Sequence, residues 1–177
     1  MDFEKIIQDE LEKNNIQDVK ICKNGQSGAV YYDGSLKIPR PVDFITFGYC
    51  FHEIGHYVLG HCDKKSPSQK KLSYVQEYEA EQYAIQKLKE YDYFNRDYEV
   101  QAIRYVLESI AQAKNRGHNI NKIPKEIVKW TGMKINKWKK AKKVFVSRGQ
   151  MDVKNKKDLK IKFLFESEKY YTILKNK

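Results

Sequence analysis

Three of the four histidines in this 177-residue chain lie within one stretch of eleven residues, FHEIGHYVLGH, at positions 51 to 61. Residues four apart lie on the same face of a helix, so His52 and His56 can direct both imidazoles at a single ion. Glu53 follows the first histidine directly. This H-E-x-x-H spacing is typical of sites in which two neutral imidazoles hold Zn²⁺ and the glutamate is the general base for a zinc-bound water.

The alternative for the same stretch is a buried apolar helix that carries two core histidines. A chance H-E-x-x-H is expected on the order of once in a hundred or more chains of this composition, so the spacing is fairly specific. Glu53 also argues against a plain core, because a glutamate is almost never fully buried without a partner, and a zinc-bound water would be one. The stretch therefore predicts a catalytic Zn²⁺ site with His52 and His56 as ligands and Glu53 as base.

Catalytic zinc usually has three protein ligands, so a third must lie elsewhere in the chain. A histidine as third ligand would follow the pattern H-E-x-x-H-x-x-G-x-x-H, which requires a glycine and a histidine where this sequence has Leu59 and Cys62. His61 misses that register by one residue. We therefore interpret His61 and Cys62 as residues of the helix end and the following loop, near the site.

The segment QEYEAEQYA, residues 76 to 84, holds the better candidates for the third ligand. In gluzincin-type peptidases, which the site resembles, that ligand is a glutamate on a later helix, and an acidic residue one turn on orients a zinc-bound histidine. Glu77 and Glu81 have this spacing, and small alanines beside them would let two helices approach. Glu79 points elsewhere by about 200° at roughly 100° per residue, so it is the rival ligand if the register differs. A solvated helix face is the alternative for all three.

The elements that must carry these residues follow from hydrophobic periodicity, capping residues and turn dipeptides. Helices are expected after Asp2, from about Asp43 to Gly60, and over about 72–91 and 97–114. Three β-prone runs, DVKI, AVYY and SLKIP, are separated by Asn-Gly and Asp-Gly dipeptides, which predicts a small antiparallel meander. We therefore expect an α+β fold with a minimal zincin-like core: an N-terminal helix, a small antiparallel sheet, the H-E-x-x-H helix and the third-ligand helix.

The formal net charge of +11 is distributed unevenly along the chain. The residues from Lys114 onward carry +15, and those before it carry −4. We divide the chain into a zincin-like metallopeptidase domain, residues 1–115, and a basic, mostly helical C-terminal extension, residues 116–177. Residues 123–145 resemble a helix-turn-helix with its turn at Gly132, and the runs VFVS and LKIKFLF could form a strand pair after it.

Three interpretations of the basic extension stay open. The first is non-specific contact with nucleic acid, which would weaken steeply with salt; base-specific contact is disfavoured because Arg116 and Arg148 are the only arginines there. The second is a solvated, lysine-rich extension that packs on the zincin-like domain through Trp130, Trp138 and Phe145. The third is contact with an acidic protein.

Composition limits the class of protein. Hydrophobic residues at 41% exclude a disordered chain, and charged residues at 32% predict a polar surface. No apolar run approaches the ~20 residues of a membrane span, and the N-terminus lacks signal-peptide features. Cys22, Cys50 and Cys62 are odd in number and lack C-x-x-C spacing, which predicts reduced thiols. We expect a cytoplasmic protein with no membrane partner; the oligomeric state stays open.

The segments GAVYYDG, LKIP, FHEIGHYVLGH and EYEAEQYA, in this order, resemble the ImmA/IrrE family of zinc metallopeptidases. The family pattern is approximately H-E-[LI]-G-H-x-x-L-x-H followed by E-x-E-A-[ND]-x-[FY]-A, and the match covers about residues 26–90. The resemblance implies that the ligands are His52, His56 and Glu77. Glu81 departs from the pattern, which usually has Asn or Asp. ArdC-like antirestriction proteins are also similar, through an E-x-x-A-E element.

The resemblance implies a zinc-dependent endopeptidase that cleaves an intracellular protein, with regulatory or DNA-binding proteins as expected substrates and Glu53 as the base. Family members are typically intracellular, often carried by phages or mobile elements, and several act on helix-turn-helix repressors. In zincin folds the substrate pairs with a sheet edge, which the LKIPRP segment could supply.

Two points stay open. The oxyanion could be stabilised by Tyr57, Tyr78, Arg104 or His118. The alternative function is a nucleic-acid-binding or phage or mobile-element accessory protein in which the zinc site is structural or vestigial.

Overall fold

The structure is a computed structural model of the chain, and the residues that it describes are 2–22, 28–30 and 33–133. The second helix of the predicted helix-turn-helix, after Gly132, and the predicted strand pair lie outside these residues. The chain forms two compact units, Met1–Glu99 and Val100–Lys177. The division falls within the predicted metallopeptidase domain, whose boundary after residue 115 stays a prediction.

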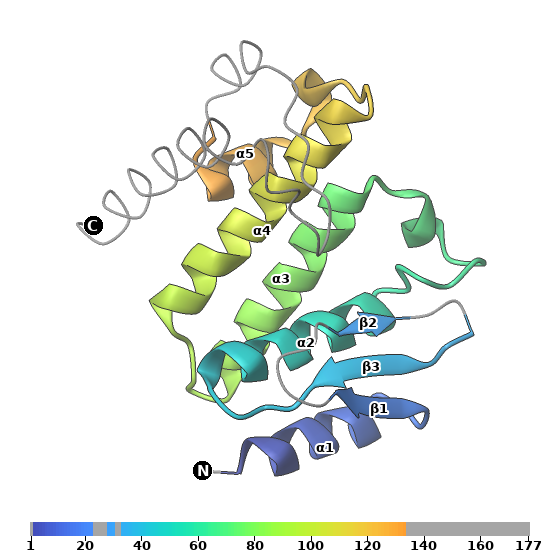
Figure 1. The fold of residues 1–177 in the computed structure, drawn as a ribbon, viewed down its shortest axis with the longest axis vertical. Coiled ribbons are helices and arrows are strands. Elements are labelled where there is room, and N and C mark those ends of the chain that lie inside the picture. Colours follow the sequence, from blue (N-terminus) through green and yellow to red (C-terminus); the bar gives the residue numbers. More distant parts are fainter. Residues whose placement is uncertain (1, 23–27, 31–32, 134–177) are drawn as a thin grey trace, which may run out of the picture. The chain divides into compact units, whose positions relative to one another are not determined.

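The first unit is α+β, as the sequence predicts (Figure 1). Its elements, in chain order, are α1 (Phe3–Lys13), β1 (Val19–Cys22), β2 (Ala29–Val30), β3 (Leu36–Pro39), α2 (Phe44–Val58), the 3₁₀ turn η1 (Pro67–Lys70), α3 (Ser73–Glu90) and the start of α4 (Arg96–Asn115). Among the described residues, none of the helices combines the length and the apolar character that a membrane span requires.

The helix ends follow local side-chain chemistry. Asp2 caps α1 by accepting a hydrogen bond from the backbone N–H of Lys5 at 3.0 Å. Asp43 caps α2 in a capping box with Thr46, whose backbone N–H donates to Asp43 Oδ1 at 2.7 Å and whose Oγ1 accepts from Asp43 N at 3.0 Å. Gly60 follows α2 with φ +68°, a conformation that favours glycine. The predicted start of α1 and the predicted start and end of α2 are confirmed.

The sheet differs from the predicted meander. Its strand order is β1-β3-β2, and β3 pairs parallel with β1 and antiparallel with β2. The prediction of an all-antiparallel sheet in sequence order is therefore wrong. The physical reason is burial: Leu36 and Ile38 of β3 are 1% and 0% exposed, whereas Ile21 of β1 is 55% exposed. Of these two strands, the more buried one, β3, lies in the centre of the sheet.

This order also corrects the predicted substrate edge. The first residues of the LKIPRP segment pair on both sides, since Leu36 and Lys37 face β1 and β2 together. The edge strand on that side is β2. Leu36 and Lys37 are therefore not at an edge, whereas Ile38 and Pro39 pair with β1 alone in the described part of the sheet.

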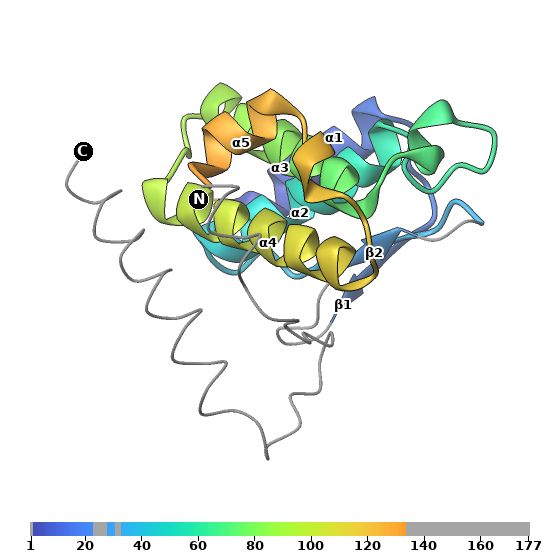
Figure 2. The same cartoon turned by 90° about the horizontal axis from the view of Figure 1, so that it is seen from above.

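Helix α2 lies between the sheet and α3 (Figure 1, Figure 2). Phe47, Phe51 and Ile54 of α2 are fully buried. Gly55 permits a close approach of α3, because a Cβ there would lie 3.3 Å from Ala80 Cα and 3.1 Å from the Tyr83 ring. The alanines predicted to allow this approach, Ala80 included, are 0% exposed. The packing of α2 against α3 is what brings the candidate site together.

In the second unit, α4 ends before Gly117, which has φ +89°. The short turn η2 (Ile120–Lys122) and α5 (Lys125–Thr131) follow. Pro124 precedes α5, and Gly132 ends it in the left-handed conformation, at the position predicted for a turn. The buried apolar residues of this unit include Ala102, Ile103, Val106 and Ile110 on α4, and Ile123 and Ile127 after it.

Candidate metal centre

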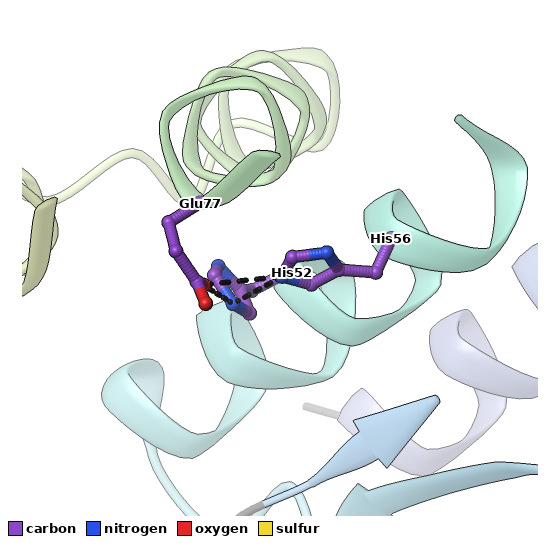
Figure 3. Close-up of side chains that lie close together, drawn as sticks. All are labelled: His52, His56 and Glu77. Carbon is purple, nitrogen blue, oxygen red and sulfur yellow. Dashed lines mark hydrogen bonds and ion pairs between the residues drawn. The ribbon is translucent and has the colours of Figure 1, made fainter. Parts of the chain in front are cut away.

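The structure brings His52 and His56 of α2 together with Glu77 of α3 (Figure 3). The two histidine Nε2 atoms are 3.1 Å apart, and Glu77 Oε2 lies 3.3 Å from His52 Nε2 and 3.2 Å from His56 Nε2. In a tetrahedral zinc site with bonds of about 2.0–2.1 Å, ligand atoms are about 3.3–3.4 Å apart. The three atoms therefore have the spacing of three corners of such a site, and the group could hold a metal ion.

The charges around the group favour a cation. His52 is 5% and Glu77 7% exposed. Burial alone would raise the pKa of Glu77, but hydrogen bonds from His52 and His56 hold it well below its usual value. Burial alone would lower the pKa of His52, but Glu81 and Glu77 raise it well above its usual value. A buried site with this excess of carboxylates stabilises positive charge, which a metal ion would supply.

Glu81 lies where the gluzincin resemblance places an orienting acid. Its Oε1 is 3.1 Å from His52 Nδ1, on the side of the ring opposite the metal-facing nitrogen. The second carboxylate oxygen lies 2.9 Å from the Tyr98 hydroxyl, which is also 3.1 Å from Gly48 O. Glu81 and Tyr98 are 1% and 0% exposed. His52 is thus oriented by a buried carboxylate that a tyrosine hydroxyl positions in turn.

His56 is oriented by a different partner. Its Nδ1 lies 2.8 Å from His61 Nδ1, and His61 Nε2 lies 3.1 Å from Glu79 Oε2. Lys71 Nζ contacts both Glu79 oxygens, at 2.6 and 2.9 Å. Glu79, the rival third ligand, therefore binds His61 and Lys71 instead of joining His52 and His56. Burial and His56 lower the pKa of His61 to about 4, so His61 is neutral at pH 7.

The side chain of Glu53, the predicted base, lies against Gly28, the residue before β2. A Cβ at Gly28 would lie 2.3 Å from Glu53 Cγ and 2.7 Å from Lys37 O, so only glycine fits beside this carboxylate. Glu53 also raises the pKa of His52, after the larger effects of Glu81 and Glu77. Burial, and to a smaller extent Glu53 and Glu77, raise the pKa of the Cys62 thiol, and Cys62 is not one of the three residues of the group.

The oxyanion candidates divide between the two units. Tyr57 on α2 and Tyr78 on α3 each follow a ligand candidate in sequence and belong to the unit that holds the group. Arg104 and His118 belong to the other unit. The choice among them stays open.

Sequence reasoning missed Gly28 and Tyr98. Gly28 lies in the GAVYYDG segment, but no periodicity signals that its missing side chain makes room for Glu53. Tyr98 is one of many aromatic residues, and nothing in its sequence neighbours indicates the buried contact with Glu81. Gly48 makes room for the tyrosine, because a Cβ at position 48 would lie 2.1 Å from the Tyr98 ring.

Comparisons with known proteins add no family to this picture. A scan against protein-family models, a search of the curated proteins and a search of the solved structures each found no match.

Proposed function

We propose that this protein is a zinc-dependent endopeptidase related to the ImmA/IrrE family. The observation that carries the proposal is the spacing of His52 Nε2, His56 Nε2 and Glu77 Oε2, which lie 3.1 to 3.3 Å apart, as three ligands of one zinc ion would. Glu53 is adjacent in sequence to one of these ligand candidates. Two imidazoles and one carboxylate form the donor set of His₂Glu catalytic zinc sites. Zinc bound there would act as a Lewis acid on the substrate carbonyl and would lower the pKa of water.

The chain's own groups would perform the proton transfers. Glu53 would accept a proton from the attacking water while the water oxygen bonds to the peptide carbonyl carbon. The same carboxyl would then donate that proton to the amine nitrogen as the C–N bond breaks, so Glu53 ends in its starting state. Glu81 and Tyr98 would hold the imidazole of His52 in one orientation throughout.

The edge strand β2 supports an extended peptide as substrate. Backbone N–H and C=O groups of a peptide can extend a sheet at a free edge, and this mode is independent of side-chain sequence. The edge begins at Gly28, which contacts the side chain of Glu53. A peptide laid along β2 would therefore pass close to the proposed base. We propose an intracellular protein, such as a regulatory or DNA-binding protein, as the substrate.

The first prediction tests Glu53. In Glu53→Gln the amide cannot accept the proton, so cleavage of a fluorogenic peptide library should fall by about 10²–10⁴-fold. Zinc content, measured by elemental analysis, should stay at the wild-type level because Glu53 is not a ligand. The matched control is Glu126→Gln, an exposed acid on α5, which should cleave at the wild-type rate.

The same assay can reject the proposal. Zinc should be lost in His56→Ala and reduced in Glu77→Ala. A wild-type protein that retains no zinc, or a Glu53→Gln enzyme that still cleaves, would end the proposed function.

A further inference from the structure

The Nδ1 atoms of His52 and His56, the two histidines of the metal centre, contact different kinds of side chain. His52 Nδ1 faces the carboxylate of Glu81, whereas His56 Nδ1 faces a third imidazole, that of His61, at 2.8 Å. Two ring nitrogens at this distance attract each other only when one carries a proton and the other does not. The contact between His56 and His61 therefore implies a definite arrangement of protons.

The positions of these protons follow from which nitrogen of His56 would bind the metal ion. A histidine that binds a metal ion through Nε2 is neutral and carries its single proton on Nδ1. His56 Nδ1–H then donates to His61 Nδ1, and His61 carries its own proton on Nε2. His61 Nε2–H in turn donates to Glu79 Oε2 at 3.1 Å, and Glu79 accepts from Lys71 Nζ at 2.6 Å. Each donor in this chain of contacts faces an acceptor.

Local backbone structure explains why His61 lies beside His56. The helix α2 ends in a Schellman motif: Gly60 N–H donates to Tyr57 O at 3.0 Å and His61 N–H donates to His56 O at 3.0 Å. The positive φ of Gly60 turns the chain back over the last turn of α2. A residue at this position of the motif packs against the residue five before it, which here is His56.

The same contacts show that His61 does not act as a ligand. Its side chain is 1% exposed, and its two nitrogens are within hydrogen-bond distance of His56 and Glu79. His61 is also outside the group of donor atoms formed by His52, His56 and Glu77. The contacts that begin at His56 end at Glu79 and Lys71, whose side chains are 29% and 39% exposed.

We propose that His61 is a positioning residue of the metal centre. It accepts a hydrogen bond from the Nδ1–H of His56 and is itself held by the Glu79–Lys71 ion pair. This inference rests on the proposed function, because it assumes that His56 binds a metal ion. A hydrogen-bond acceptor behind a metal-bound imidazole fixes the ring and raises its basicity, and losing such a partner typically weakens metal binding by about 10–100-fold. The centre would thus have two independent supports, one for each histidine.

The test measures zinc affinity by competition with a chromophoric chelator. His61→Leu removes the acceptor and should bind zinc about 10–100-fold more weakly than the wild type. His61→Asn places an amide oxygen near the position of the lost Nδ1, so it should recover affinity toward the wild-type value. The control is Lys125→Leu, an exposed residue of the second unit, which should leave zinc affinity unchanged.

A second readout separates positioning from ligation. The visible absorption spectrum of the Co²⁺-substituted protein reports the ligand set, and it should keep its band positions in His61→Leu because the three ligands are retained. Glu79→Gln should weaken zinc binding in the wild-type background and have little further effect in His61→Asn, because its effect passes through the His61 imidazole. If His61→Leu does not fold, as judged by circular dichroism, His61→Asn and Glu79→Gln carry the test.

The outcomes are distinct. Zinc affinity within about twofold of the wild type in folded His61→Leu would overturn this inference alone, as would an unchanged affinity in Glu79→Gln where His61→Leu does not fold. A Co²⁺ spectrum that loses a nitrogen ligand in His61→Leu would make His61 a ligand and would also overturn it. A wild-type chain that binds no zinc would overturn the proposed function and this inference together.

Discussion

At the scale of single residues, the feature with the sharpest consequence is the contact between Gly28 and Glu53. A Cβ at position 28 would lie 2.3 Å from Glu53 Cγ and 2.7 Å from Lys37 O, and the latter is a backbone atom that cannot move aside easily. Gly28 is not among the described glycines with positive φ, so the lack of space, and not the backbone conformation, requires glycine here.

Gly28→Ala should therefore displace Glu53 without touching the ligands. We expect kcat/KM for a cleaved peptide to fall by on the order of 10²-fold, because a shift of about 1 Å in a catalytic group has that effect. Zinc affinity should change little. Gly34→Ala is the control for general damage to the hairpin, since it strains a residue with φ +87° but meets no atom within 4 Å. Equal kcat/KM in Gly28→Ala and the wild type would contradict the assigned position of Glu53.

At the scale of elements, α1 is attached to α3 through a buried carboxylate. Glu10 of α1 is 1% exposed, and its oxygens lie 2.9 Å from Lys87 Nζ, 2.8 Å from the Tyr83 hydroxyl and 3.1 Å from the Tyr91 hydroxyl. Burial alone would raise the pKa of Glu10, but hydrogen bonds from Lys87 and Tyr83 lower it below its usual value of 4.5. Helix α1 thereby supports the helix that carries Glu77.

Glu10→Gln should destabilise the fold by about 3 kcal/mol, the lower end of the range for breaking a buried ion pair, because Lys87 keeps Glu90 as a partner at 3.0 Å. Urea denaturation at pH 7 measures this free energy of unfolding. Glu12→Gln is the matched control: Glu12 is an exposed acid on the same helix, and its replacement should change stability by less than about 0.5 kcal/mol. A loss for Glu10→Gln no larger than for Glu12→Gln would contradict the role of the contact.

The pH dependence of stability follows from the same residue. The pKa of Glu10 is lower in the folded state, so the unfolded state binds more protons in acid. The stability contributed by Glu10 is complete above pH 4.5 and is lost as the pH falls through the folded-state value. The stability of Glu10→Gln should therefore fall less steeply below that pH than the stability of the wild type.

At the scale of the whole molecule, a metal ion would add a bond to each of two helices that already contact each other through packing and through the pair His52–Glu81. Ligands from α2 and α3 are far apart in an unfolded chain, so zinc binds the folded state preferentially. At free zinc of 100 times the dissociation constant, the stabilisation is about 2.7 kcal/mol. Circular dichroism melting should show a higher Tm with zinc and a return to the apo value with EDTA. His56→Ala should show no such shift, and an equal shift in that variant would place the binding elsewhere.

The sequence by itself determined what depends on neighbouring residues. Helix bounds were predictable because capping by Asp2 and Asp43 and helix termination at Gly60 are local interactions. The pairing of His52 with His56 was predictable because i, i+4 spacing is a property of helix geometry alone. The apolar runs of the three strands were likewise visible, since alternation and turn dipeptides act over a few residues.

Only the tertiary structure decided what depends on packing between distant segments. The strand order was not predictable, because the burial of β3 reflects its neighbours rather than its own pattern. The orientation of α3 about its own axis places Glu77, and not Glu79, beside His52 and His56. That orientation depends on the close approach of Ala80 to Gly55. The contacts of Tyr98 with Glu81 and of His61 with Glu79 join residues 17 and 18 positions apart, so they exist only once the helices have packed.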